Sequence, residues 1–111
     1  MYQIPNNNQF IRGTTPTFEI TVKTEIDLHQ VSKIWIYISQ QNKVKVDKEL
    51  EDVTFDYENR KMSITLTQDE TLGLKEGDAI LQIRLLIGDV AMATIGHQVE
   101  VLPIYKDGVI E

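Results

Sequence analysis

The side chains that could catalyse a reaction are few in this sequence and widely separated. The two histidines, His29 and His97, lie in a predicted turn and near the start of a predicted strand. Zinc binding or histidine-assisted catalysis needs imidazole groups beside carboxylates or a serine, and nothing in this spacing brings such groups together. The serines lie in or beside strand patterns and lack the Gly-x-Ser-x-Gly turn of an activated nucleophile. We therefore expect a protein that is not an enzyme, with no catalytic residues and no cofactor.

The one candidate for a metal site is an acidic run in the middle of the chain, made up of Asp47, Glu49, Glu51, Asp52 and Asp56. Calcium takes about six to eight oxygen ligands, which carboxylates supply. The run lacks the glycine-punctuated Asp-x-Asp spacing of a dedicated calcium loop, and a lysine lies within it. We therefore expect no bound metal and a solvated, partly disordered loop.

The composition describes one small acidic domain. The chain has 111 residues, 17 Asp and Glu against 11 Lys and Arg, a net charge of −6 and no cysteine. The absence of cysteine excludes disulfides, thiol nucleophiles and cysteine-ligated zinc. The acidic balance argues against nucleic acid and anionic membranes as partners, because both are bound mainly through Lys and Arg. We also expect no signal peptide, since the start of the chain is neither basic nor strongly apolar.

Apolar and polar residues alternate with a period of two through most of the chain, which predicts β-strands. The clearest pattern covers residues 17–23. Residues 33–39 are rich in β-branched and aromatic residues on both faces, which predicts a central strand covered on both sides, with Trp35 as the core aromatic residue. Further strands are predicted at residues 43–48, 53–57, 61–67, 79–87, 90–95 and 97–101.

Short turns and helical segments separate these strands. Thr67 and Glu70 have the spacing of a capping box, which predicts a helix over residues 68–75 ended by Gly77. A helical turn is predicted at 27–30, a hairpin turn at 58–60 with Asn59 suited to positive φ, and a tight hairpin turn at Gly88 and Asp89.

These elements predict an all-β fold, an immunoglobulin-like (Ig-like) antiparallel β-sandwich of about seven or eight strands with one short helical crossover. One domain then covers residues 1–111, with residues 1–9 and 103–111 as terminal extensions. Apolar termini beyond a complete sandwich either dock on their own domain or pair with a neighbouring chain. The second alternative makes six apolar side chains candidates for partner binding: Tyr2, Ile4, Ile104, Tyr105, Val109 and Ile110.

Three segments resemble a known group of proteins: residues 10–18 (FIRGTTPTF), 66–72 (LTQDETL) and 106–110 (KDGVI). In this order they resemble short Ig-like structural proteins encoded in phages and prophages of Firmicutes, which are similar to the Ig-like domain of phage upper-baseplate proteins. None of the three segments is catalytic. The resemblance therefore implies an architecture and a setting, which is the virion, or the bacterial cytoplasm when the protein is expressed from a prophage.

Two functions follow as hypotheses. The first is a non-enzymatic structural protein of a phage tail or baseplate, an adapter that binds other phage structural proteins or associates with itself. The alternative is a small glycan-binding module for recognition of the host-cell surface, with Tyr37 and Tyr57 as candidate sugar contacts.

Overall fold

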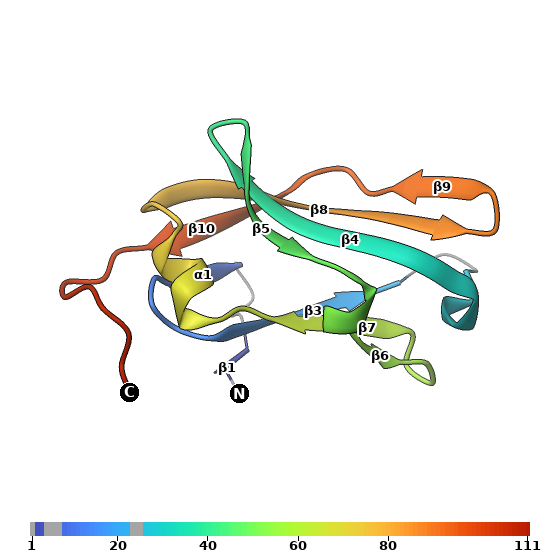
Figure 1. Ribbon diagram of the computed structural model, residues 1–111, viewed down its shortest axis with the longest axis horizontal. Helices are drawn as coiled ribbons and strands as arrows, with labels where there is room; N and C mark the ends of the chain where they lie inside the picture. Colours follow the sequence, from blue (N-terminus) through green and yellow to red (C-terminus); the bar gives the residue numbers. More distant parts are fainter. Residues whose placement is uncertain (1, 4–7, 23–25) are drawn as a thin grey trace.

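The computed structural model describes residues 2–3, 8–22 and 26–111, which form two facing β-sheets (Figure 1). The first sheet has the order β1-β3-β7-β6, with β1 at Tyr2–Gln3, β3 at Pro16–Thr21, β7 at Lys61–Thr65 and β6 at Thr54–Asp56. The second has the order β2-β10-β8-β4-β5, with β2 at Gln9–Ile11, β10 at His97–Leu102, β8 at Gly77–Ile87, β4 at Val31–Gln40 and β5 at Lys43–Lys48. A further strand, β9 at Val90–Ala93, pairs with β8. The predicted all-β sandwich is confirmed.

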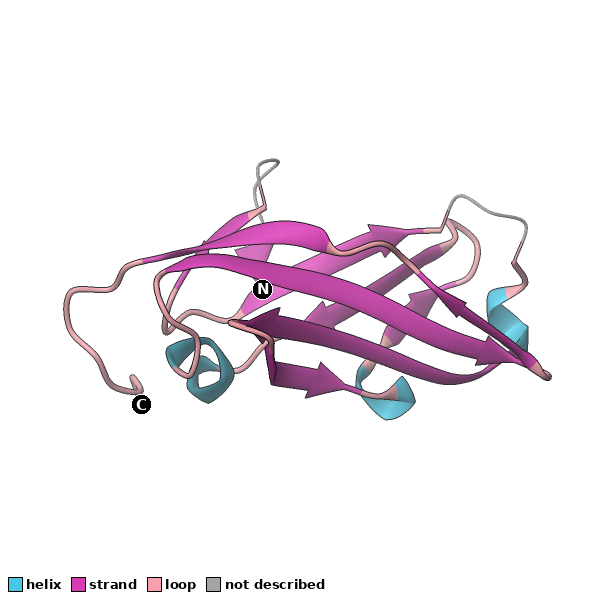
Figure 2. Cartoon of the chain, turned by 90° about the horizontal axis from the view of Figure 1, so that it is seen from above, coloured by secondary structure: helices cyan, strands magenta, loops and turns pink. Residues whose placement is uncertain are grey.

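Short helical segments lie at the periphery of the strands (Figure 2). They are η1 at Leu28–Gln30, η2 at Leu50–Asp52 and α1 at Gln68–Leu72. The predicted helical turn at 27–30 is confirmed by η1, which Asp27 caps through the backbone N–H of His29. The acidic run is exposed to solvent as predicted, but the prediction that it is partly disordered is wrong, because Glu49 and Asp52 form a capping box that gives η2 a defined conformation.

The core lies between the two sheets and is built from alternate residues of the strands. On β4 the inward residues are Ile34, Ile36 and Ile38, which are fully buried. They lie opposite the inward residues of β8, with Ile36 paired to Ile83. Burial of an aliphatic side chain of this size contributes about 1.5–3 kcal/mol to stability. The long central β4–β8 pair is therefore the main apolar support of the fold.

Trp35 is not part of this core, so the prediction that it is the core aromatic residue is wrong. Its side chain lies on the outer face of β4 and is 47% exposed. The residue opposite Trp35 on β8 is Arg84, whose guanidinium carbon lies 5.2 Å from the centroid of the Trp35 ring. Because Trp35 and Arg84 are both exposed on this face, β4 is central in its sheet but covered on one side only. Phe10 and Phe18 are the aromatic residues of the core, in edge-to-face contact at 5.8 Å.

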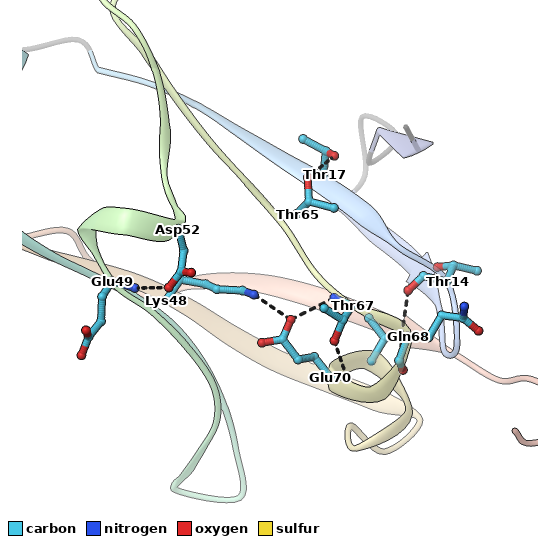
Figure 3. Close-up of polar contacts among 10 residues, drawn as sticks. Thr14, Thr17, Lys48, Glu49, Asp52, Thr65, Thr67, Gln68 and Glu70 are labelled. Atoms are coloured by element: carbon cyan, nitrogen blue, oxygen red, sulfur yellow. Dashed lines mark hydrogen bonds and ion pairs between the residues drawn. The ribbon is translucent and has the colours of Figure 1, made fainter. Parts of the chain in front are cut away.

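The capping box that begins α1 is confirmed. The Thr67 hydroxyl accepts from the Glu70 N–H at 3.1 Å, and Glu70 Oε1 accepts from the Thr67 N–H at 2.9 Å (Figure 3). Lys48 Nζ also reaches Glu70 Oε1 at 2.8 Å and thereby ties the helix to β5. The helix ends earlier than predicted, at Leu72, because the chain turns inward at Gly73 to bury Leu74.

Thr67→Ala is expected to lower the free energy of unfolding by about 1 kcal/mol, because one backbone donor of α1 loses its acceptor. The measurement is urea denaturation followed by circular dichroism. Thr15→Ala is the matched control, since the exposed Thr15 side chain makes no hydrogen bond with a described residue. Equal unfolding midpoints for the two variants would contradict the cap.

The turn between β6 and β7 also differs from its prediction. The positive φ falls on Arg60, at 56°, and not on Asn59. The Asp56 carboxylate accepts from both the backbone and the side-chain N–H of Asn59, which anchors Asn59 within a longer turn. Arg60 then donates to the Ile26 carbonyl at 3.0 Å and joins this turn to the segment before η1.

Two strand pairs near the N-terminus are parallel, a feature that the predicted antiparallel sandwich did not include. β1 pairs with β3, and β2 pairs with β10. The β2 pairing buries Phe10 completely in the core. This part of the N-terminal region therefore docks on its own domain.

Candidate interaction surfaces

The three segments that carry the resemblance meet at one end of the sandwich, around α1. We call this place the α1 corner and define it by Arg12, Gly13, Thr14, Gln68, Thr71, Leu72, Leu74, Asp107 and Ile110. Arg12 is its centre. The Arg12 guanidinium donates to the carbonyl oxygens of Leu74 at 2.7 Å and Leu72 at 2.8 Å, and pairs with the Asp107 carboxylate at 3.1 Å.

A second set of bonds in the α1 corner surrounds the buried hydroxyl of Thr71. It accepts from the Gly13 N–H at 2.9 Å and donates to the Thr14 carbonyl at 2.9 Å. Gly13 has a φ of +80°, and a Cβ there would lie 3.0 Å from the Ile104 side chain. The position thus requires glycine for both its conformation and its contacts. These bonds give the residues of the recognised segments structural roles.

The C-terminal tail, residues 103–111, carries four of the six predicted partner-binding residues. Its backbone is held to α1, because the Gln68 side chain accepts from the Ile110 N–H at 2.8 Å and donates to the Ile110 carbonyl at 3.1 Å. Ile104 is partly buried against Gly13. Tyr105 and Ile110 are 94% and 82% exposed, and Val109 is also exposed. The tail therefore presents apolar side chains to solvent from a backbone with fixed contacts.

The other two predicted residues are at the N-terminus. Tyr2 belongs to β1, where its backbone pairs with Pro16 of β3. Ile4 lies outside the described residues.

The structure adds an exposed surface that the sequence analysis missed, on the outer face of the second sheet. We call it the Trp35 surface. It is a shallow hollow of about 270 Å³ whose lining includes Lys33, Trp35, Arg84, Leu86, Ala91 and Met92. Neither Lys33 nor Arg84 forms an ion pair with a described residue. The surface therefore combines an aromatic ring with two available cations on an acidic protein.

A second missed feature is the exposed strand β9. All four of its residues are exposed, and Ile95, just beyond it, is 80% exposed. β9 lies at the end of the molecule opposite α1 and the C-terminus (Figure 1).

The two histidines have separate surroundings. His29 stacks on Tyr57 with ring centroids 3.8 Å apart, and Tyr57 stacks in turn on Phe55. The backbone N–H of His29, and then its ring, bond to the Asp27 carboxylate and hold the pKa of Asp27 below its usual value. His97 is exposed at the start of β10. Within the described part of the chain, no three His, Asp or Glu side chains are grouped so as to hold a metal ion.

The hydrogen bonds of one surface carboxylate, that of Asp56, predict that the fold is less stable in acid. Hydrogen bonds from the Asn59 side chain and then its backbone hold the pKa of Asp56 below the ordinary value of 3.8. The unfolded chain therefore binds this proton more readily, so the carboxylate stabilises the fold above its ordinary pKa and ceases to do so in acid. We expect the melting temperature to fall from about pH 5 to about pH 3, and to fall less in Asp56→Asn. Glu58→Gln is the control and should keep the wild-type slope; an unchanged slope in Asp56→Asn would contradict the prediction.

Comparison with known proteins adds no family assignment, because no protein-family model and no curated protein matches the chain. Among the residues that the structure describes, none of the helices has the length and apolar character needed to cross a membrane.

Proposed function

We propose that the chain is a non-enzymatic structural protein of a phage or prophage tail or baseplate, an Ig-like adapter that acts by protein–protein assembly. The setting rests on the resemblance of three segments, each of which contributes residues to the α1 corner. The location that goes with this proposal is the virion, or the bacterial cytoplasm when the protein is expressed from a prophage.

The observation that carries the proposal is the conformation of the C-terminal tail. Tyr105 and Ile110 are almost fully exposed, although Gln68 and Arg12 fix the segment that bears them. A few side chains supply most of the affinity of a protein interface, and tyrosine is among the residues enriched at such positions. A fixed backbone also lowers the entropic cost of binding.

The test is binding to the proteins encoded by neighbouring genes, each purified and measured by biolayer interferometry. We expect one of them to bind, and the Tyr105→Ala, Ile110→Ala double variant to bind about tenfold or more weakly, a loss of about 1.4 kcal/mol. Trp35→Ala is the control, because it removes an exposed aromatic side chain from a different surface. Absence of binding by every neighbouring product, or equal affinity of the double variant, would refute the proposal.

A second candidate function, recognition of a host-surface glycan, is favoured by the exposure of Trp35. Its ring lies on the same face of β4 as Tyr37, whose hydroxyl donates to Gln82 Oε1 at 2.7 Å. Aromatic rings beside polar groups are a common surface for ligands with both apolar and hydroxyl faces. A glycan array and purified host-wall polymers test it with the wild type, Trp35→Ala and Tyr57→Ala. Binding lost only in Trp35→Ala supports this function, and no binding to any wall polymer removes it.

A further inference from the structure

The second sheet has an open edge at β9 that bears no charge. Residues 90–96 read Val-Ala-Met-Ala-Thr-Ile-Gly, and among the described strands β9 pairs only with β8. The edge strand β5 has lysines at positions 43, 45 and 48, and β6 is three residues long and ends in Asp56. β1 and β2 are also very short. Charged residues and short length are the usual means of blocking edge pairing, and β9 lacks the charge.

The backbone groups that face outward from β9 follow from its register. The Thr94 N–H bonds to the Ile83 carbonyl at 2.9 Å, so the backbone of Thr94 faces β8. Hydrogen-bonding direction alternates along an antiparallel strand, so the backbone of Met92 also faces β8. The N–H and C=O groups of Ala91 and Ala93 therefore face outward, and no described residue bonds to them, which leaves two donors and two acceptors for a further strand.

We propose that the occupant of this edge is β9 of a second copy of the chain, antiparallel, with the two-fold axis at Met92. The strand is nearly palindromic about this residue, since alanines flank Met92 and the isosteric Val90 and Thr94 follow on either side. A two-fold contact requires such self-complementarity. Ala91 of each copy would pair with Ala93 of the other, to give four backbone hydrogen bonds.

Charge favours this occupant. In the proposed register Asp89 lies opposite Ile95 of the second copy, so that no residue of the pairing faces a like charge. Pairing of β9 with β5 would instead place three lysines beside an uncharged strand with no acidic partner. Contact at β9 also keeps the C-terminal tails of the two acidic chains far apart, because β9 and α1 lie at opposite ends of the long axis (Figures 1 and 2).

This inference extends the proposed assembly function, because a β9 dimer would present two C-terminal tails, one at each end. The molecule is 45 Å long, and an edge-to-edge dimer lengthens it further. Such a dimer could bind two copies of a structural partner at once, which raises avidity without new contacts.

Sedimentation velocity over a concentration series tests the inference on the full chain. We expect a reversible monomer–dimer equilibrium in the wild type. Met92→Lys and Met92→Glu place like charges opposite each other at the axis, and each is expected to weaken dimerisation about tenfold or more, since a loss of about 1.4 kcal/mol is tenfold. An equimolar mixture of the two variants is expected to dimerise again, because opposite charges then meet at the axis.

Dimerisation of the mixture would show that each variant is folded and that residue 92 of one copy contacts residue 92 of the other. Val44→Lys is the control, since Val44 is an exposed residue of the β5 edge, and it should dimerise like the wild type. A wild type that stays monomeric at every concentration, or a dimer that survives in Met92→Lys, would overturn the inference. Failure of the proposed function would be seen in a different measurement, the binding of neighbouring gene products. That binding is expected to depend on Tyr105 and Ile110 and not on Met92.

Discussion

Phe10→Ala is expected to lower the free energy of unfolding by about 3–5 kcal/mol, the range for loss of a large aromatic side chain from a core. Phe10 is completely buried and packs edge-to-face on Phe18. It belongs to β2, a strand of three residues whose parallel pairing with β10 supplies few hydrogen bonds. The side chain is therefore a main attachment of this strand, and its loss removes a large fraction of the total stability of about 5–15 kcal/mol for a domain.

Urea denaturation of Phe10→Ala beside Trp35→Ala measures this effect. Trp35→Ala is expected to cost about 1 kcal/mol or less, because its ring is half exposed and an exposed cation–π contact with Arg84 contributes only about 0.5–1 kcal/mol. The larger of the two side chains should thus have the smaller effect. A greater loss in Trp35→Ala would show that the outer face of β4 is covered.

Alternation of polar and apolar residues was sufficient to predict most of the strands. It succeeds for residues 17–21 and 79–87 because one face of each strand is in the core and the other contains polar groups, whereas position 23 of the first predicted strand lies outside the described residues. The start of α1 was predicted for a similarly local reason, since both bonds of the capping box join residues three positions apart. The end of the helix depends on burial of Leu74, a tertiary contact that the local sequence does not reveal.

The inner face of β4 was not predicted, because residues 33–39 have large β-branched or aromatic side chains on both faces. The sequence pattern of the neighbouring strand, β8, distinguishes the two faces of β4. On β8, Gln82 and Arg84 alternate with aliphatic residues, and pairing places Tyr37 and Trp35 opposite them. Comparison of the two patterns would have assigned Trp35 to the outer face. The parallel pairing of β2 with β10 joins chain segments from opposite ends, for which a single sequence has no local signal.

The sequence likewise indicated one candidate surface, the C-terminal tail, and did not indicate the other, the open edge at β9. The apolar character of Tyr105 and Ile110 was visible in the sequence, but their exposure depends on the bonds of Gln68 to the tail backbone. The open edge at β9 could not be predicted from its residues alone, because an apolar run of this length is equally typical of a buried strand. Only the sheet topology shows that β10 and β9 pair with successive parts of β8. It also shows that β2 pairs with β10 and not with β9, so that the edge at β9 stays open among the described strands.

Arg12 connects the fold to the proposed function. Its guanidinium donates to the carbonyl of Leu72 at the end of α1, to that of Leu74 just beyond it, and to Asp107 in the tail, so that one side chain positions both elements. Arg12→Ala is expected to lower the free energy of unfolding by about 2–3 kcal/mol, since a hydrogen bond to a charged group contributes about 1.5–3 kcal/mol and two acceptors lose their donor. Differential scanning calorimetry or urea denaturation gives this value.

Two further variants separate the contributions of Arg12. Arg12→Lys is expected to restore only part of the loss, because an ammonium group lacks the planar fork that reaches both Leu72 and Leu74. Asp107→Ala should cost about 0.5 kcal/mol or less, as the carboxylate is exposed. If Arg12 positions the tail, Arg12→Ala also weakens partner binding beyond its effect on stability, whereas Thr67→Ala, which destabilises the same helix without touching the tail, does not. Equal losses of binding in both variants would show that stability of α1 alone governs the tail.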